Sequence, residues 1–233
     1  VYENSHTTKP LFYKISGVWG NHEGSLLLWI SILIIFSFLF TYKNRSLEKK
    51  FIYLTLFFQN ILIFEFLIFL LTNSNPFSMI YPVPKEGLGL NPILQDPALA
   101  IHPPLLYLGF VGSSIYFSAA LASLISNFTG SNFAYSIKFW VLISWFFQTL
   151  GIMVGSIWAY YELGWGGYWF WDPVENSSLM PWFLMTALLH SILILQRKTD
   201  IYLWVITLSI LTFTMSVTGT FLVRSGVLNS AHT

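Results

Sequence analysis

Long apolar runs alternate with short polar connections along the chain. A helix needs roughly 20 apolar residues to cross the hydrocarbon core of a bilayer. Six runs are long enough, and they cover residues 25–42, 51–72, 105–128, 139–161, 177–196 and 201–223. Five of them contain no Asp, Glu, Lys or Arg, and the second contains Glu65. The pattern predicts an all-α, polytopic transmembrane bundle of about six helices.

Basic residues gather in three of the connections, which follow the first, third and fifth runs. These connections hold seven of the eleven basic residues: Lys43, Arg45, Lys49, Lys50, Lys138, Arg197 and Lys198. Short loops rich in Lys and Arg stay on the cytoplasmic or matrix side. We therefore expect four segments on the external side: residues 1–24, 73–104, 158–182 and 222–233.

Composition agrees with a membrane protein, because 9% of the residues are charged and 55% are hydrophobic, against about a quarter charged in soluble proteins. The net charge of +1 is confined to loops and gives no sign of a nucleic-acid partner. The absence of cysteine excludes a disulfide, a thiolate metal site and a catalytic thiol in this chain. A start at Val1 and a stop just after an apolar run are typical of a piece of a longer or split protein.

Residues 158–182 hold five of the ten tryptophans: Trp158, Trp165, Trp169, Trp171 and Trp182. Gly166 and Gly167 lie among them and allow the backbone to lie flat beside the rings. A tryptophan-walled shelf at a membrane surface suits a large, flat, mostly apolar ligand with a polar edge. Haem is such a ligand.

Two histidines are predicted on the same external side as this shelf. His102 precedes Pro103 and Pro104 at the mouth of the third run, and His232 follows the sixth run. Neutral imidazole is a common axial ligand of haem iron. The alternative is that both are interfacial histidines hydrogen-bonded to loop carbonyls.

His190 falls about midway along the fifth run, where an ionisable residue is costly and is a functional candidate. As a ligand it would bind a second haem within the membrane. The alternative is a neutral imidazole hydrogen-bonded to a neighbouring helix. His22, near the start of the first run, is interpreted as structural.

Other polar residues accompany the shelf. Arg224, at the external end of the sixth run, is a candidate partner for a haem propionate, and the alternative is an arginine that snorkels to the interface. Asp172 and Glu175 flank Pro173 at the start of the fifth helix, where the helix dipole favours acids. For these two we expect a role in capping and in shelf geometry.

The tryptophan-rich stretch continues as Asp172-Pro173-Val174-Glu175-Asn176, and this combination resembles the CcmF-type haem lyase family of cytochrome c biogenesis. Residues 6–29, 91–109 and 219–232 resemble, in the same order, other stretches of that family. Tyr168 stands where the signature more often has tryptophan.

The resemblance implies a membrane subunit that joins haem vinyl groups to the thiols of a Cys-x-x-Cys-His motif in apocytochrome c. The expected location is the mitochondrial inner membrane or the bacterial plasma membrane, with the working face in the intermembrane space or the periplasm. By position, His102 and His232 correspond to ligands of a b-type substrate haem at the shelf, and His190 to one ligand of a resident haem b. The implied partners are apocytochrome c, a haem-delivery chaperone, other maturation subunits with any separate C-terminal half, and membrane lipid.

A second hypothesis is a haem carrier or export subunit that binds and relays haem without ligating it. A pure carrier has less need of a histidine inside the membrane, so His190 favours the lyase. A third hypothesis is a structural subunit that recruits chaperones and binds no haem.

Overall fold

The structure is a computed structural model that describes residues 1–164, 167–198 and 200–227. Helices and their connections make up this described part, which contains no β-strand. The α-helices are α1 (Leu11–Ser16), α2 (His22–Lys43), α3 (Lys49–Asn73), α4 (Pro97–Phe110), α5 (Ser114–Ser126), α6 (Gly130–Glu162), α7 (Pro173–Leu195) and α8 (Tyr202–Arg224). Two short 3-10 helices are η1 (Gly17–Trp19) and η2 (Pro92–Leu94).

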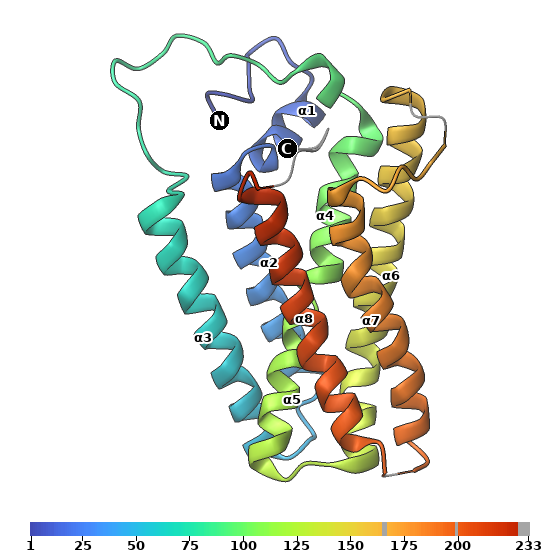
Figure 1. The fold of residues 1–233 in the computed structure, drawn as a ribbon. Coiled ribbons are helices and arrows are strands. Elements are labelled where there is room, and N and C mark those ends of the chain that lie inside the picture. Colours follow the sequence, from blue (N-terminus) through green and yellow to red (C-terminus); the bar gives the residue numbers. More distant parts are fainter. Residues whose placement is uncertain (165–166, 199, 228–233) are drawn as a thin grey trace.

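Six helical segments of the described chain are long and apolar enough to cross a membrane, which confirms the predicted transmembrane bundle. They are α2, α3, α4 together with α5, α6, α7 and α8. Figure 1 shows the three basic connections at one end, which we call the basic end. The N-terminal segment, the α3–α4 loop and the α6–α7 connection lie at the other end, which we call the tryptophan end.

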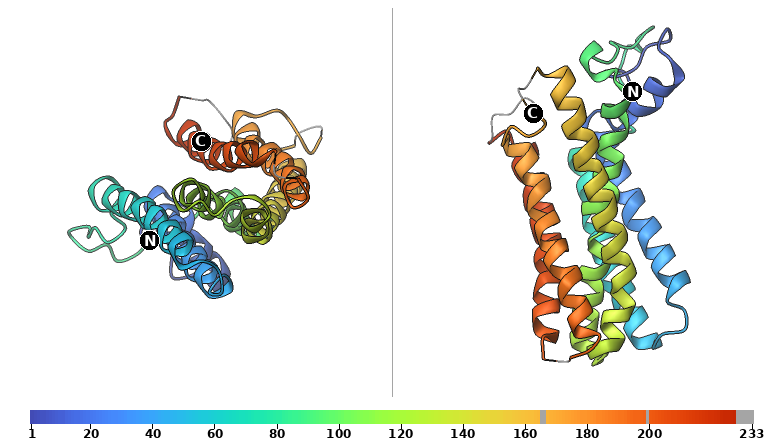
Figure 2. Two further views of the ribbon diagram at one scale, coloured as in Figure 1. Left: turned by 90° about the horizontal axis from the view of Figure 1, so that it is seen from below. Right: turned by 90° about the vertical axis from the view of Figure 1, so that its right-hand side faces the viewer.

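The bundle has two sides joined through the third crossing. Seen along the helices, α2 and α3 lie on one side and α6, α7 and α8 on the other, with α4 and α5 between them (Figure 2). The closest packing follows this arrangement, because α4 packs on α6, α7 on α8 and α3 on α5. Glycines allow α4 and α6 to approach closely, since a Cβ on Gly109 would lie 2.8 Å from Cα of Gln148.

The third crossing begins at Pro97, eight residues before the predicted start at residue 105. Asp96 is the N-cap, and its Oδ1 accepts hydrogen bonds from the N–H groups of Ala98 (2.8 Å) and Leu99 (3.0 Å). Pro103 and Pro104 therefore lie inside α4 rather than in its first turn. Pro104 cannot donate to the carbonyl of Ala100, and the indole N–H of Trp19 donates to that carbonyl instead, at 3.3 Å.

The same crossing is interrupted at residues 111–113, between α4 and α5. The chain continues there through tight turns, because the N–H of Ser113 bonds to the carbonyl of Phe110 and that of Ser114 to Val111. A Cβ on Gly112 would lie 2.7 Å from the ring of Phe36, so only glycine allows α2 to pack this closely against the joint.

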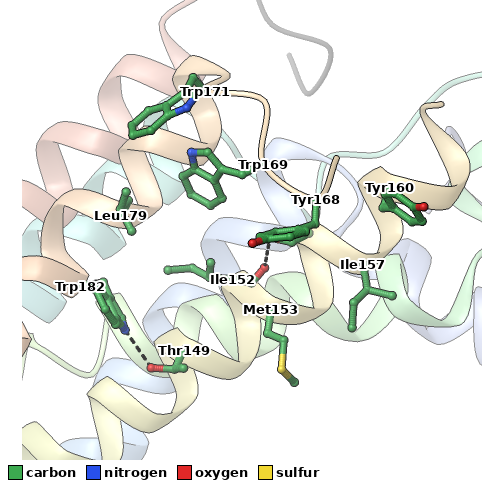
Figure 3. Close-up of a pocket in the computed structure, with 11 residues that line it drawn as sticks. Thr149, Ile152, Met153, Ile157, Tyr160, Tyr168, Trp169, Trp171, Leu179 and Trp182 are labelled. Carbon is green, nitrogen blue, oxygen red and sulfur yellow. Dashed lines mark hydrogen bonds between the residues drawn. The ribbon is translucent and has the colours of Figure 1, made fainter. Parts of the chain in front are cut away.

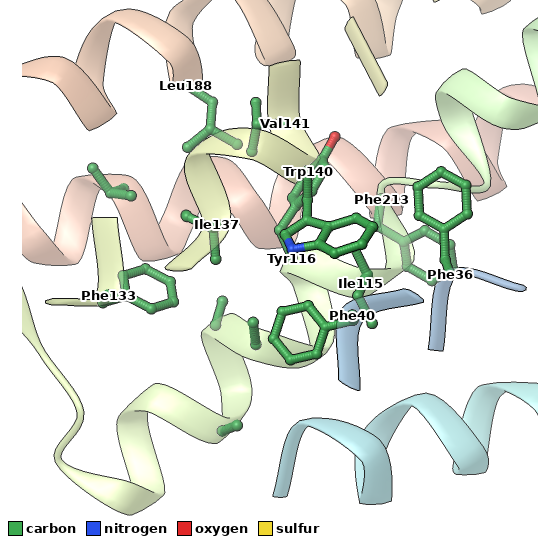
Figure 4. Packing of buried hydrophobic residues seen from close by; sticks show 14 of the residues in the cluster. Phe36, Phe40, Ile115, Tyr116, Phe133, Ile137, Trp140, Val141, Leu188 and Phe213 are labelled. Carbon is green, nitrogen blue, oxygen red and sulfur yellow. The ribbon is translucent and has the colours of Figure 1, made fainter. Parts of the chain in front are cut away.

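Large aromatic side chains fill the core between α2, α5 and α6 (Figure 4). Trp140 of α6 is 2% exposed, and its ring packs against Phe36 and Phe40 of α2 with centroids 5.9 and 5.6 Å away. Tyr116 of α5 is fully buried beside it. This packing holds the helices together below the tryptophan end.

Candidate functional site

The connection between α6 and α7 is anchored at its α7 end by a capping box. Asp172 Oδ1 accepts from the N–H of Val174 at 2.9 Å. Glu175 Oε2 accepts from the N–H groups of Phe170 (3.0 Å) and Asp172 (3.1 Å). Trp171 has a φ of 61°, which non-glycine residues rarely adopt. Asp172 and Glu175 thus cap α7 and hold the turn that presents Trp171.

A cavity of about 760 Å³ lies beside this turn, against α6 and α7 (Figure 3). Trp169, Trp171 and Trp182 of the predicted shelf line it, and the rings of Trp169 and Trp171 meet edge to face with centroids 6.3 Å apart. The remaining lining residues are Thr149, Ile152, Met153, Ser156, Ile157, Tyr160, Tyr168 and Leu179. Small-molecule sites have volumes of about 300–1,000 Å³ and mainly apolar and aromatic walls. We call this space the tryptophan cavity.

Most of this lining comes from one face of α6, which the sequence interpretation overlooked. Six α6 residues line the cavity, from Thr149 to Tyr160, at spacings of three and four residues. That spacing is the signature of a single helical face. It was visible in the sequence, but a run that is apolar all round gives no reason to prefer one face over another.

Trp158 lies on a different face of α6 from the cavity, and His102 of α4 lies next to that face. Trp158 is buried, at 3% exposure, and follows Gly151 and Gly155 at helical spacing on the face turned toward α4. His102 of α4 packs against that same face. The described structure therefore brings together three of the shelf tryptophans but places neither Trp158 nor His102 in the cavity lining.

His102 is held between α4 and α6. Its Nδ1 lies 2.6 Å from the carbonyl oxygen of Gly151. A carbonyl only accepts, so Nδ1 carries the proton and the lone pair of the neutral ring is on Nε2. Gly155 provides the space for the ring, because a Cβ there would lie 2.4 Å from His102 Cε1.

His190 lies on the outer surface of α7, five residues before the helix ends at Leu195. It is thus nearer the basic end than the predicted midpoint, since α7 begins as early as Pro173. Its Nδ1 donates to the carbonyl of Thr186, at 2.8 Å, which again leaves the lone pair on Nε2. Leu179, about three turns earlier on the same helix face, lines the tryptophan cavity. The cavity and His190 therefore share one side of the molecule.

Three of the predicted site residues, Trp165, Gly166 and His232, lie outside the described residues. Gly167 is described, and a Cβ at this position would meet no atom within 4 Å. The predicted need for glycine beside the rings is therefore not apparent at Gly167 itself.

Arg224 connects three helices at the tryptophan end. Its Nη1 donates to Nδ1 of His22 at 2.8 Å, and its Nη2 to the hydroxyl of Tyr107 at 2.9 Å. Within the described chain no carboxylate lies at ion-pair distance from it. Arg224 also lines a second cavity, of about 590 Å³ between α2, α3 and α8, which includes Glu65 and His22. His22 is thus a hydrogen-bond partner of Arg224, and its interpretation as structural stays a prediction.

The tryptophan cavity provides suitable contacts for the porphyrin ring of haem but no histidine ligand for its iron among the described lining residues. Its aromatic and aliphatic walls suit a flat apolar ring. No histidine is among the described lining residues, so an axial ligand would have to come from elsewhere. His190, with its lone pair on Nε2, has the chemistry of a haem ligand, but it lies about three turns beyond Leu179 along α7 and so suits a second haem rather than one in the tryptophan cavity.

Curated relatives match this chain over its whole length. It is 55% identical over 232 residues to the cytochrome c-type biogenesis protein CycK of Bradyrhizobium diazoefficiens, covering 100% of this chain and 35% of the relative. It is 47% identical over 233 residues to the cytochrome c-type biogenesis protein CcmF of Escherichia coli, covering 100% of this chain and 36% of that protein. The chain thus spans about a third of the length of these relatives.

A solved structure named "Cytochrome c Heme Lyase CcmF" has the same fold. It superposes with a TM-score of 0.77 at 33% identity, over 94% of this chain and 35% of that one. The family described as "Cytochrome C assembly protein" matches residues 19–228. With these matches and six helices able to span a membrane, the chain belongs to the cytochrome c assembly protein family as an integral membrane protein.

Proposed function

We propose that this chain is the haem-handling part of a cytochrome c haem lyase, which holds haem for thioether attachment to the Cys-x-x-Cys-His motif of apocytochrome c. The observation that carries the proposal is the tryptophan cavity of a cytochrome c assembly protein, whose lining includes Trp169, Trp171 and Trp182. The solved structure with the same fold bears the name of a haem lyase. The family assignment and the aromatic walls together favour haem over other flat ligands.

The residues of the cavity bind and orient the substrate. The indole rings provide apolar contact and stacking for the porphyrin, while the capping box at Asp172 keeps Trp171 in place. When bound, haem supplies the vinyl groups and the redox-active iron, and the protein supplies position and surroundings.

Three histidines and one arginine complete the proposed site. By the family resemblance, His102 and His232 are the proposed axial ligands of the substrate haem, and His190 a ligand of a resident haem b. In this structure His102 lies against Gly151 and Gly155 on the α4-facing side of α6, apart from the tryptophan cavity. A backbone acceptor on Nδ1, as at His102 and His190, orients a metal-binding imidazole through Nε2. Arg224 has donors beyond those that bind His22 and Tyr107, and these suit a propionate.

The proposed partners are apocytochrome c, a haem-delivery chaperone and other maturation subunits, including the remainder of the protein or a separate C-terminal half, with lipid around the bundle. The proposed location is the mitochondrial inner membrane or the bacterial plasma membrane, with the tryptophan end facing the intermembrane space or periplasm. The excess of Lys and Arg at the basic end supports this orientation.

The test uses the full-length protein co-expressed with an apocytochrome. We expect haem-stained cytochrome that survives denaturation, and a strong decrease of this product in His102→Ala, His190→Ala and Trp182→Ala. His6→Ala is the matched control, because His6 contacts Thr8 (2.9 Å) and Glu86 (3.7 Å) in the N-terminal region and none of the proposed haem-handling residues among the described ones. Haem bound without covalent product in the wild type would indicate a carrier instead. Absence of bound haem in the wild type would overturn the proposal.

A further inference from the structure

Two tryptophans and two threonines form a reciprocal contact between α6 and α7. Trp145 Nε1 of α6 donates to Thr186 Oγ1 of α7 at 2.9 Å, and Trp182 Nε1 of α7 donates to Thr149 Oγ1 of α6 at 2.8 Å. Each threonine hydroxyl in turn donates to the tryptophan carbonyl one turn earlier in its own helix, at 2.7 and 2.9 Å. We call these four residues the Trp–Thr interlock.

The interlock has a sequence basis. Trp145-Phe-Phe-Gln-Thr149 and Trp182-Phe-Leu-Met-Thr186 repeat one spacing, Trp-x-x-x-Thr, on two antiparallel helices. Because the helices run in opposite directions, each tryptophan lies level with the threonine of the other helix. The two indole rings then stack, with centroids 6.3 Å apart and planes 24° apart. Two of the four hydrogen bonds cross between the helices, and together with the ring stack they hold α6 against α7 at this level.

The interlock lies between the two proposed haem-handling positions. At its upper level, Trp182 and Thr149 are part of the wall of the tryptophan cavity. At its lower level, the carbonyl of Thr186 accepts the Nδ1–H of His190, while the hydroxyl of the same residue accepts the indole N–H of Trp145. Thr186 thus ties the backbone that orients His190 to helix α6.

We infer that the Trp–Thr interlock positions His190: Trp145 and Thr186 hold the α7 backbone so that the Nε2 of His190 keeps a fixed orientation relative to the tryptophan cavity. This inference rests on the proposed function, because it takes His190 as a haem ligand. Trp145 and Thr186 are positioning residues that act through His190. Outer-shell partners of metal-binding histidines commonly change metal affinity about 10–100-fold when they are removed.

The experiment measures haem retention and the low-temperature spectrum of the full-length protein in detergent, with added haem as the probe. Thr186→Val and Trp145→Phe each delete the same interhelical bond. We expect each to weaken retention of the His190-dependent haem about tenfold and to alter its spectrum. The double variant is expected to match the single ones, because all three lack one shared bond. Thr186→Ser keeps the hydroxyl and is expected to behave as the wild type.

Thr212→Val is the matched control, because the buried Thr212 hydroxyl bonds only to the Leu208 carbonyl of its own helix among the described residues. Equal haem loss in Thr212→Val and Thr186→Val would mean a purely structural effect and would overturn the inference. The inference would also be overturned if Thr186→Val and Trp145→Phe left the spectrum unchanged while His190→Ala abolished the His190-dependent haem. If His190→Ala has the same haem spectrum as the wild type, that result would instead contradict the proposed function.

Discussion

At the residue scale, the position of His102 depends on Gly155, because the absence of a side chain at Gly155 leaves the space that the imidazole ring occupies. The imidazole lies directly over the α-carbon of Gly155, and its Nδ1 reaches the Gly151 carbonyl one turn away. A methyl group at position 155 would overlap Cε1 and Nδ1, at 2.4 and 2.6 Å. The ring can avoid that overlap only by giving up its hydrogen bond or by separating α4 from α6.

We therefore expect Gly155→Ala to destabilise the protein by about 1–3 kcal/mol, as overpacking does in well-packed interiors. It is also expected to reduce haem binding that depends on His102. Thermal unfolding of the full-length protein in detergent measures the first effect. Gly167→Ala is the control, because a Cβ there meets nothing within 4 Å. Equal unfolding midpoints for the two variants would contradict this account of Gly155.

The candidate site was predictable from residue types but not from their faces. Tryptophan enrichment identified the segment, and Trp169, Trp171 and Trp182 do line one cavity. Trp158 faces α4 instead, because it lies on the same helical face as Gly151 and Gly155. A uniformly apolar run does not indicate which face of the helix packs against a neighbour. The separation of His102 from the cavity could therefore be seen only once the packing of α4 on α6 was known.

At the element scale, α3 is attached to α5 by a buried polar network. Gln59 is fully buried, its Nε2 donates to Ser114 Oγ at 2.9 Å, and its Oε1 accepts from Ser118 Oγ at 2.8 Å. Most of the rest of α3 is exposed in the described structure, as expected of a helix that faces lipid or another chain segment. Gln59 is therefore a main specific attachment of this helix.

Gln59→Leu is expected to weaken the α3–α5 contact by about 1 kcal/mol, the range of interhelical hydrogen bonds in membranes. Disulfide trapping between cysteines placed on α3 and α5 would report this as slower or less complete cross-linking. Thr72→Val is the control, because the exposed Thr72 hydroxyl donates only to Ile68 of its own helix among the described residues. Trapping that is as efficient in Gln59→Leu as in Thr72→Val would argue against the network.

The helices themselves were largely predictable, and the exception has a physical cause. Runs of about 20 apolar residues identify five crossings to within a few residues, except that α6 begins nine residues early at Gly130. The third crossing was predicted to start at residue 105, just after Pro103 and Pro104, whereas in the structure it starts at Pro97 with Asp96 as its N-cap. Two adjacent prolines lie inside this helix, and Trp19 bonds to the Ala100 carbonyl that Pro104 leaves without an amide donor.

At the scale of the whole molecule, the N-terminal segment is tied to the α3–α4 loop at the tryptophan end. The N–H of Leu88 bonds to the carbonyl of Tyr2 at 2.8 Å. Glu86 accepts from the hydroxyl of Thr7 at 2.8 Å and from its N–H at 3.3 Å. These hydrogen bonds lower the pKa of the Glu86 carboxyl below its ordinary value of 4.5.

Because the pKa of the Glu86 carboxyl is lowered, the stabilising contact between Glu86 and Thr7 is fully present above the ordinary carboxyl pKa. It is lost as the pH falls through the pKa of the folded state. We expect amide exchange at Leu88 to accelerate, relative to the intrinsic rate, as the solution is acidified below pH 4.5. Thr7→Val is expected to give fast exchange already at neutral pH, because the carboxylate loses its side-chain donor. Protection that does not depend on pH in the wild type would contradict this role of Glu86.

The interruption at residues 111–113 divides the third crossing into two halves, and each half packs mainly against a different helix. One continuous helix would present a single set of faces along its whole length, whereas α4 turns toward α6 and α5 toward α3. The third crossing therefore connects two groups of helices. One group carries the tryptophan cavity, and the other contains the α2–α3 pair. A change of direction at residues 111–113 would therefore alter how the two groups lie relative to each other, and Gly112, packed against Phe36, is the position where an added side chain would disturb this joint.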